Sequence, residues 1–463
     1  MVKHVLVAGA GASGLMAAIT AARSGAKVTL LEAMDRPGRK LLVTGNGRCN
    51  LTNLDPKLAS AYHGADPAFA KSVIDQFPPE KTLDFFHGLG LLTTDRGGYV
   101  YPYTNQASSV LEVLLSEVRR LKIKVKLSEK IERIFRKEEQ WKVQTATWTY
   151  SCDSLILCCG SKCMPQTGSD GSGYVLAASA GLSVHTPSPA LTPLLGEGKF
   201  LSSLAGVRCH AHVTLLCSHH TTEKRTADSA QSARYDKKAK NTLSAPISSS
   251  KAAFLSSSRV IGAEKHNAAY RKETVWETVA SECGELQWTK YGISGIAVFQ
   301  LSRHVSCASK NERFAAELDL LDPYSDDEVL YVLRTRAQAL SQEKISVLLR
   351  GLLPEKLIPV IQEKAGIPAK MTCAALDEKS LVALLHTCRA FRLTITGTKD
   401  FDTCQVCAGG VDPSALFPET MECRSVPGLY FAGELLDVDG PCGGYNLQWA
   451  WSSGYVAGHH AAV

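Results

Sequence analysis

Three glycines and one acidic residue near the start of the chain have the types and spacing of a dinucleotide-binding site. Gly9, Gly11 and Gly14 lie in the string GAGASG, and Glu32 follows 18 residues after the last of them. In such a motif the first glycine permits a tight turn, the second lets the backbone approach a pyrophosphate, and the third lets helix and strand pack closely. The acidic side chain accepts hydrogen bonds from the ribose of the adenosine. We therefore expect a bound dinucleotide here.

Two further glycine turns follow apolar, strand-like runs much later in the chain. The run LILCCGS has its turn at Gly160, and the run GLYFAGE has its turn at Gly433, followed by Glu434. Together with the turn at Gly9, these strand ends suit a long extended ligand that reaches across several loops of one sheet. We therefore expect the dinucleotide to be FAD.

The C-terminal glycine turn leads into a final helix that we expect from about residue 445. A loop with Asp439 and then Gly444 precede this helix, and Asn446 and Leu447 lie in its first turn. The free amides and the dipole of a helix N-terminus stabilise negative charge. If this end of the helix faces the flavin ring, it favours the negative charge that develops when the ring is reduced.

A strongly polar loop follows the first motif. Residues 44–53 read TGNGRCNLTN, with two glycines, three asparagines, an arginine and a cysteine, and such a stretch buries little apolar surface. We interpret it as a loop that wraps the cofactor. Gly45 and Gly47 would let the main chain close on the flavin, and the asparagines would satisfy the amides of the loop itself.

No spacing in the sequence identifies catalytic residues, but four side chains are candidates. Tyr101, in the string YVYP, could donate a proton, although a structural tyrosine is the stronger alternative. Cys49 and Cys442 lie in loops expected at the flavin, where a thiol could titrate or relay electrons, but small-residue packing explains them adequately. Arg48 could hold an anionic substrate or a carbonyl of the flavin.

The elements that must position these residues follow from the apolar patterns. Three prolines between residues 187 and 193 predict a domain boundary. The patterns at 207–217 and 284–322 are strand-like, apart from a helix expected to start at Gly295. From 325 to 387 the apolar spacing is helical, which predicts a separate group of helices.

Composition places the chain among ordinary globular proteins. It has 463 residues, of which 45% are hydrophobic and 21% charged, enough for two or three domains. No apolar run approaches the roughly 20 residues of a membrane span. The strand-like HVLVAG begins at His4 and leaves no room for a cleavable leader. We therefore expect a cytoplasmic protein without a membrane segment.

The metal- and redox-active residue types show no diagnostic pattern. The fifteen cysteines are odd in number and contain no paired C-x-x-C motifs, so we expect no disulfide scaffold. The lone CQVC at Cys404 and Cys407 could be a redox pair, but it lies in a strand-like run without the helix N-terminus that lowers a thiol pKa. The thirteen histidines show no metal-ligand spacing, and we expect no metal.

The net charge of +6 comes from one segment. Residues 218–273 hold 11 Lys and Arg against 5 Asp and Glu, a surplus of 6, and the rest of the chain is balanced. The segment is rich in Ser, Ala and Lys, and we expect a solvated, disordered insertion. A nucleic-acid-binding arm is the alternative, but no aromatic residues alternate with the charges as stacking platforms would, which favours the solvated insertion.

Beyond these local signals, several strings of the sequence resemble one family. They are GAGASG, RPGRKLLVTGNGRCNLTN, YVYP, PQTGSDGSGY, TKYGISG, TGTKDFDTCQVCAGGV and GLYFAGELLDVDGPCGGYNLQWAWSSGYVAG, spread from residue 4 to residue 458. In these strings the chain is similar to the BaiN-like flavoproteins, the FAD-binding oxidoreductase family that includes aminoacetone oxidase-like enzymes.

The resemblance implies an α/β fold with three domains. A Rossmann-type FAD-binding domain would be built from both chain ends, 1–187 and 399–463. A β-barrel-like domain would be inserted at 188–322 and 389–398, and a small helical domain at 323–388. It also implies a set of residues around the FAD, namely Ser13, Glu32, Arg39, Lys40, Gly45, Glu434, Asp439, Asn446 and Leu447.

Three functions remain open. The favoured one is an NAD(P)H-dependent reductase, in which NAD(P)H is a transient electron donor and an enone-like or polycyclic small molecule is the substrate. The second is a flavin oxidase of a small amine. The third is an FAD-containing protein associated with nucleic acid through residues 218–273. The oligomeric state does not follow from the sequence.

Overall fold

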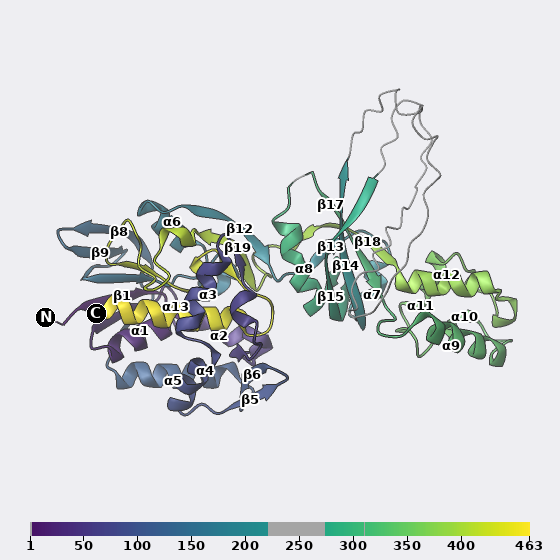
Figure 1. Ribbon diagram of the computed structural model, residues 1–463, viewed down its shortest axis with the longest axis horizontal. Coiled ribbons are helices and arrows are strands. Elements are labelled where there is room, and N and C mark those ends of the chain that lie inside the picture. Colours follow the sequence, from purple (N-terminus) through teal and green to yellow (C-terminus); the bar gives the residue numbers. More distant parts are fainter. Residues whose placement is uncertain (1, 221–273, 310) are drawn as a thin grey trace, which may run out of the picture.

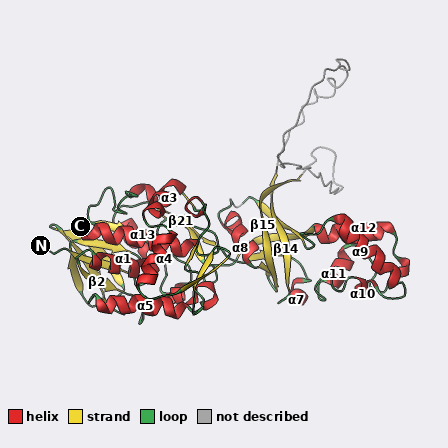
Figure 2. Ribbon diagram, turned by 60° about the horizontal axis from the view of Figure 1, so that its bottom comes forward, coloured by secondary structure: helices red, strands yellow, loops and turns green. Residues whose placement is uncertain are grey.

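The computed structural model describes residues 2–220, 274–309 and 311–463. They form three bodies in a row, which are an α/β body that contains both chain ends, a β-barrel and a group of helices (Figure 1). A second view shows the same order (Figure 2). The chain leaves the α/β body after Ala190 and returns to it after Thr398, so the barrel and the helices are an insertion.

The α/β body is built on a five-stranded parallel sheet. Its strands lie in the order β20 (Leu429–Phe431), β11 (Ser154–Leu157), β1 (His4–Ala8), β2 (Lys27–Leu31) and β7 (Lys124–Lys126). Val7 pairs with Ile156 on one side and with Leu30 on the other. The central strands are short apolar runs that are buried along nearly their whole length, as a parallel sheet covered on both faces requires.

The first and last helices of the chain pack against each other beside this sheet. These are α1 (Ala12–Arg23) and α13 (Tyr445–Ala462). A Cβ atom on Gly454 of α13 would lie 2.5 Å from the carbonyl oxygen of Ser13, so the contact requires a glycine. This close contact brings the two ends of the sequence to one site.

Smaller elements complete the α/β body. Its other helices are α2 (Arg39–Val43), α3 (Pro67–Gln76), α4 (Pro79–Gly88), α5 (Ala107–Arg120) and α6 (Ser172–Ser179). The antiparallel strands are β3 (Thr52–Asn53), β5 (Thr93–Arg96) and β6 (Tyr99–Pro102), then β8 (Ile131–Lys137), β9 (Gln140–Thr145) and β10 (Thr149–Cys152), and the pairs β4 (His63–Gly64) with β21 (Val438–Asp439) and β12 (Val184–Ala190) with β19 (Val406–Val411).

The middle body is a closed six-stranded barrel. Its strands follow the order β13 (Leu194–Gly196), β16 (Gly292–Ser294), β15 (Thr274–Thr289), β14 (Arg208–His220), β17 (Arg313–Asp319) and β18 (Phe391–Thr398), and β18 pairs back with β13. Helices α7 (Leu201–Leu204) and α8 (Ile296–Ser306) accompany the barrel. Alternate residues of β15 point inward, and Leu286 and Trp288 are fully buried.

The third body contains α9 (Asp326–Ala339), α10 (Ile345–Leu348), α11 (Ile358–Lys364) and α12 (Glu378–Arg389). Helix α9 begins with a capping box, in which the Ser325 hydroxyl accepts from the Glu328 amide and the Glu328 carboxylate accepts from the Ser325 amide. Leucines and isoleucines of these helices join the hydrophobic core of the barrel, so the two bodies share one core.

The architecture expected from the sequence is confirmed, namely an α/β Rossmann-type body from both chain ends with an inserted barrel and helices. The boundary expected between residues 187 and 188 falls inside β12, whose last residues still pair with β19. Residues 218–220 extend β14, whereas the rest of the segment 218–273 lies outside the described residues. Among the described residues, no helix has the length and apolar character that crossing a membrane requires.

Candidate functional site

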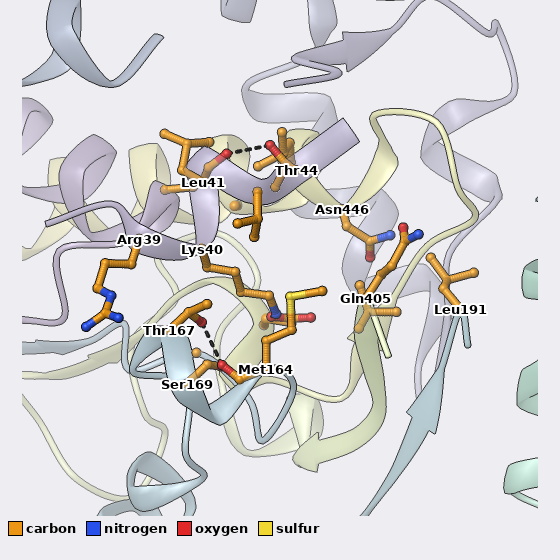
Figure 3. Close-up of a pocket in the computed structure, with 18 of the residues that line it drawn as sticks. Arg39, Lys40, Leu41, Thr44, Met164, Thr167, Ser169, Leu191, Gln405 and Asn446 are labelled. Atoms are coloured by element: carbon orange, nitrogen blue, oxygen red, sulfur yellow. Dashed lines mark hydrogen bonds and ion pairs between the residues drawn. The ribbon is translucent and has the colours of Figure 1, made fainter. Parts of the chain in front are cut away.

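A cavity of about 800 Å³ lies where the α/β body meets the barrel. Its walls come from the glycine turn after β1, from α2 and the loop after it, from the start of α13, and from β14, β15 and α8 of the barrel. Figure 3 shows part of the wall, with Lys40 and Asn446 on opposite sides. The residues expected at the cofactor that line it are Gly9, Gly11, Ser13, Glu32, Arg39, Lys40, Gly45, Gly160, Glu434, Gly444, Asn446 and Leu447.

The turn after β1 has the three glycine roles expected from the sequence. Gly9 has φ +99°, and a Cβ atom there would lie 2.4 Å from the carbonyl oxygen of Cys158. A Cβ on Gly14 would lie 1.8 Å from the carbonyl oxygen of Gly9, so this glycine permits the packing of α1 on the turn. A Cβ on Gly11 would meet no protein atom within 4 Å. The backbone at Gly11 is therefore open to a ligand in the cavity.

Glu32, at the end of β2, anchors this turn and also faces the cavity. The Ala10 amide donates to Oε2 at 2.7 Å, and the Met34 amide donates to Oε1 at 2.9 Å. Burial raises the pKa of Glu32, and these amides oppose that rise. A carboxylate held in this way can still accept hydrogen bonds from ribose hydroxyls through its remaining lone pairs.

Lys40 and Glu434 form an ion pair in the wall of the cavity. Lys40 Nζ donates to Glu434 Oε2 at 2.5 Å, and both side chains are largely buried. Burial by itself lowers the pKa of Lys40, but the charge and hydrogen bond of Glu434, together with smaller contributions, bring the pKa above its ordinary value. Arg39, the preceding residue, reaches Asp35 at 3.6 Å. Both cations at the start of α2 are therefore paired with carboxylates where this helix lines the cavity.

The polar loop 44–53 is attached to the start of α13. Asn53 Nδ2 donates to the Gly443 carbonyl at 2.8 Å, and Thr52 Oγ1 donates to Gln448 Oε1 at 2.6 Å. Trp451 Nε1 donates to the Leu51 carbonyl at 2.9 Å. The polarity of this loop thus serves two purposes, since it fixes the loop on the last helix and leaves Gly45, Asn46 and Arg48 facing the cavity.

The N-terminus of α13 opens onto the cavity. Gly444 precedes the helix with φ +97°, and Asn446 and Leu447 of the first turn line the wall. The side chain of Asn446 is held by the backbone of Gly440, to whose carbonyl its Nδ2 donates at 2.7 Å and from whose amide its Oδ1 accepts at 2.8 Å. The first turn of α13, whose amides have no partner within the helix, therefore lies at the cavity wall.

Two buried acceptors in the cavity wall fit a bound FAD. Asn50 Oδ1 and Glu434 Oε1 are buried, and neither has a hydrogen-bond partner among the described residues. Buried polar atoms in folded proteins are nearly always paired, so these two oxygens call for a donor from a ligand. The ribose and ribityl hydroxyls and the ring N–H of FAD are donors of this kind, and the residues present therefore fit the cofactor.

Comparisons with known proteins agree with this geometry. The family model described as "HI0933-like protein Rossmann domain" matches residues 3–460. The chain belongs to the HI0933-like family. It is similar to the 3-dehydro-bile acid delta(4,6)-reductase of Clostridium scindens, with 38% identity over 459 residues that cover 98% of each chain. The ribosomal RNA dihydrouridine synthases of Haemophilus influenzae and Escherichia coli are 29% and 26% identical, each over 97% of this chain and 96% of the relative.

This HI0933-like protein is an FAD-dependent oxidoreductase. A full-length reductase relative and a glycine turn that opens onto a large cavity give the same assignment. The family resemblance noted in the sequence is confirmed by the match over almost the whole chain.

Three residues expected at the cofactor support the cavity of this HI0933-like protein from behind. Gly14 packs α1 on the turn, as described above. A Cβ on Gly433 would lie 2.4 Å from Ser13 Oγ, so this glycine lets β20 end close to α1. Asp439 is buried and accepts from Arg303 of α8, with Nη2 3.1 Å from Oδ1 and Nε 3.2 Å from Oδ2. Asp439 therefore joins the α/β body to the barrel.

The catalytic candidates also divide into residues that line the cavity and one that does not. Tyr101, Arg48 and Cys442 line the cavity, whereas Cys49 is fully buried and does not. Burial raises the pKa of Cys49 and that of Cys442 to about 12 in each case, so both thiols are neutral at physiological pH. A neutral thiol is a poor nucleophile and a poor electron relay, which leaves Tyr101 and Arg48 as the side chains suited to acid–base work or substrate binding.

The barrel supplies a wall that sequence reasoning did not assign. Arg208, Glu285, Gln287, Ile296 and Phe299 line the cavity from β14, β15 and α8. One signal was present in the sequence, because polar residues alternate with buried Leu286 and Trp288 along β15 and mark an outward face. That alternation does not reveal which part of the molecule the outward face meets.

Proposed function

We propose that this protein reduces a carbon–carbon double bond conjugated to a carbonyl group, with electrons from NAD(P)H. The observation that carries the proposal is the full-length similarity to a 3-dehydro-bile acid delta(4,6)-reductase. The dihydrouridine synthases support the same bond type, since their product name denotes a uridine ring with one double bond reduced. Both reactions add a hydride to one carbon and a proton to its neighbour, next to a carbonyl that takes up the developing negative charge.

When bound, FAD supplies the hydride chemistry, and the chain must hold and tune it. The turn at Gly11, the carboxylate of Glu32 and the pair Lys40–Glu434 would bind the cofactor along the first part of the cavity. The amides at the start of α13 would stabilise negative charge, by about 0.3–1 kcal/mol where exposed and up to about 2 kcal/mol where partly buried.

The rest of the cavity wall suits a flat and largely apolar substrate. Leu191, Ile296 and Phe299 give apolar surface, and Tyr99 and Tyr101 give aromatic surface. The guanidinium of Arg96 lies 5.3 Å from the ring centroid of Tyr101 and helps to hold that ring in place. We assign the Tyr101 hydroxyl as the proton donor to the substrate, because Tyr101 is half-buried whereas the other cavity-lining tyrosine of its strand, Tyr99, is 43% exposed. A phenol also needs no change of charge before it donates a proton.

NAD(P)H would reach the same cavity from solvent. The residues that the structure describes contain one strand–glycine–helix motif with a terminal acid, at Gly9 to Glu32, and we assign it to FAD. The donor and the substrate would therefore bind in turn at the barrel side of the cavity. All fifteen cysteines are free thiols, which supports the reducing environment of the cytoplasm.

A second candidate is reduction of uridine in RNA. The two dihydrouridine synthases cover the chain almost completely, although at lower identity than the bile acid reductase. The chemistry at the cavity would be the same, and only the substrate would differ. The amine oxidase hypothesis also remains, and it differs in using oxygen as the electron acceptor.

Anaerobic rapid mixing tests these alternatives. NADH or NADPH should bleach the flavin absorption band, and a 3-oxo-4-ene bile acid or steroid should then restore it with a product heavier by two hydrogens. Restoration by a uridine-containing RNA, but not by the steroid, would favour the second candidate. No bleaching by either nicotinamide within minutes would contradict an NAD(P)H-dependent reductase, and bleaching by a small amine would favour the oxidase.

A further inference from the structure

Three potential metal ligands meet on the outer surface of the barrel, and two of them lie two residues along their strands from Arg208 and Glu285 of the cavity wall. His210 lies on β14, Cys283 on β15, and Asp322 in the segment after β17. One ligand atom from each lies within 4.8 Å of the others. The three residues are 73 and 39 positions apart, so no local spacing in the sequence could reveal them, and the sequence-based expectation of no metal did not consider them.

The strand register explains how these side chains meet. His210 and Cys283 occupy diagonal positions on paired strands, because His210 pairs with Glu285 and His212 pairs with Cys283. Residues at such diagonal positions on one face are within reach of each other. Asp322 comes from the other neighbour of β14, since it follows three residues after the end of β17.

The distance between the thiol and the imidazole matches that between two ligands of a tetrahedral zinc ion. Cys283 Sγ lies 3.6 Å from His210 Nε2 and 3.1 Å from Asp322 Oδ2, and His210 Nδ1 lies 4.0 Å from Asp322 Oδ2. With Zn–S near 2.3 Å and Zn–N near 2.0 Å, tetrahedral geometry places sulfur and nitrogen about 3.5 Å apart. The separation of the thiol from Nε2 of the imidazole already has this value. The carboxylate lies closer to the thiol than this and faces Nδ1, the other ring nitrogen, so Asp322 has to move when the ion binds.

Other roles for this triad fit less well. A nucleophilic cysteine needs a lowered pKa, but the hydrogen bond to Asp322 and the negative charge around it raise the pKa of Cys283. A thiol, an imidazole and a carboxylate are the three side-chain types that bind Zn²⁺ in proteins. Two of the residues are exposed and the third is half-buried, so an ion can enter from solvent and water can occupy its fourth position.

We propose that His210, Cys283 and Asp322 form a Zn²⁺ site on the barrel surface. Binding breaks the S–H bond of Cys283, releases that proton to solvent and forms an S–Zn bond, with no change in oxidation state. The ion ties the paired strands β14 and β15 to the segment through which the chain enters α9 at Asp326. It therefore fixes the start of the helical body on the barrel. This inference does not depend on the proposed reductase function.

Site-specific alkylation of the flavin-loaded, chelator-treated protein tests the proposal. Cys283 and Cys307 are both exposed thiols of the same chain, and Cys307 is the internal control. Labelling by N-ethylmaleimide, quantified by peptide mass spectrometry, should slow at least about tenfold at Cys283 when ZnCl₂ is added, since the metal holds the reacting thiolate. Labelling at Cys307 should not change.

Variants separate the site from non-specific zinc binding. His210→Ala and Asp322→Asn should each remove most of the protection of Cys283, whereas His386→Ala, an exposed histidine on α12, should leave it intact. The flavin absorption spectrum verifies that each variant is folded. Equal labelling of Cys283 with and without zinc would overturn the proposal, and so would protection that persists in the double variant His210→Ala/Asp322→Asn.

Hydrogen exchange provides an independent test of whether the zinc ion fixes the segment after β17 on the barrel. Zinc should slow amide exchange in the peptide that spans residues 320–325, because Asp322 becomes fixed to two strands of the barrel. Exchange in the central sheet around β1 should not change and serves as the reference. If exchange at 320–325 is unchanged at zinc concentrations that protect Cys283, the ion does not fix this segment on the barrel.

Discussion

Replacing Arg303 by methionine would remove the partner of a buried carboxylate while keeping most of the apolar length of the side chain. Arg303, on α8 of the barrel, donates two hydrogen bonds of 3.1 and 3.2 Å to Asp439 of the α/β body. The side chain of Asp439 is 2% exposed and that of Arg303 is 24% exposed. The substitution therefore leaves a carboxylate without access to water and without its counter-charge.

The size of the effect follows from this burial. Burial, together with the charges of Asp437 and Glu434, raises the pKa of Asp439 to about 6, although Arg303 lowers it. Two unit charges about 4 Å apart interact by about 4 kcal/mol at an effective dielectric constant of 20. Breaking a buried ion pair costs about 3–5 kcal/mol. We expect Arg303→Met to lower the free energy of unfolding by about 3 kcal/mol at pH 8.

The loss of unfolding free energy in Arg303→Met should be larger at high pH than at low pH. Because the folded-state pKa of Asp439 lies above the ordinary value of 3.8, the folded protein holds a proton there that the unfolded chain has lost. This group therefore makes the wild-type protein less stable as pH rises from about 4 to about 6. Without Arg303 the pKa rises further, and the window extends above pH 6. At pH 5 Asp439 is largely protonated in both proteins, and the loss should shrink to about 1 kcal/mol.

Urea unfolding at pH 5 and pH 8, followed by tryptophan fluorescence, measures this difference. Arg313→Met, at an exposed arginine of β17, is the matched control and should change stability little at either pH. Burial and the charge of Arg303 lower the pKa of His63 to about 4, so that pKa should rise in the variant and can be followed by NMR. Equal destabilisation at pH 5 and pH 8 would refute the reasoning, and so would an unchanged His63 titration.

Other substitutions test the cofactor site and the proposed proton donor. Gly14→Ala should prevent folding or lower stability by several kcal/mol, because its Cβ would lie 1.8 Å from a backbone oxygen, whereas Gly88→Ala has free space and should be nearly neutral in thermal unfolding. Gly11→Ala should leave the stability of the apoprotein unchanged but weaken FAD binding at least about tenfold in a titration, since only the ligand would meet the new methyl group. Tyr101→Phe should lower kcat about 100-fold with FAD content unchanged, and Tyr103→Phe, at a largely exposed tyrosine, should not. Wild-type turnover in Tyr101→Phe would exclude this hydroxyl as the proton donor.

Local features of the site could be predicted from the sequence because they depend on short spacings. The turn at Gly9, the helix that follows it and the acid at Glu32 belong to one β–α–β unit, whose geometry is set within about 30 residues. The polar loop 44–53 was likewise recognisable from composition. Its attachment to α13 through Thr52 and Asn53 was not, because those bonds span nearly 400 residues.

The sequence by itself determined the cofactor class and the α/β framework, since glycine spacing and apolar periodicity act over one or two turns of backbone. Only the tertiary structure decided which distant side chains meet. Arg303 pairs with Asp439 because α8 packs on the C-terminal loop, and His210 meets Cys283 because β14 and β15 pair in one particular register. A shift of that register by one residue would turn each side chain to the opposite face, and the sequence pattern alone does not select the register.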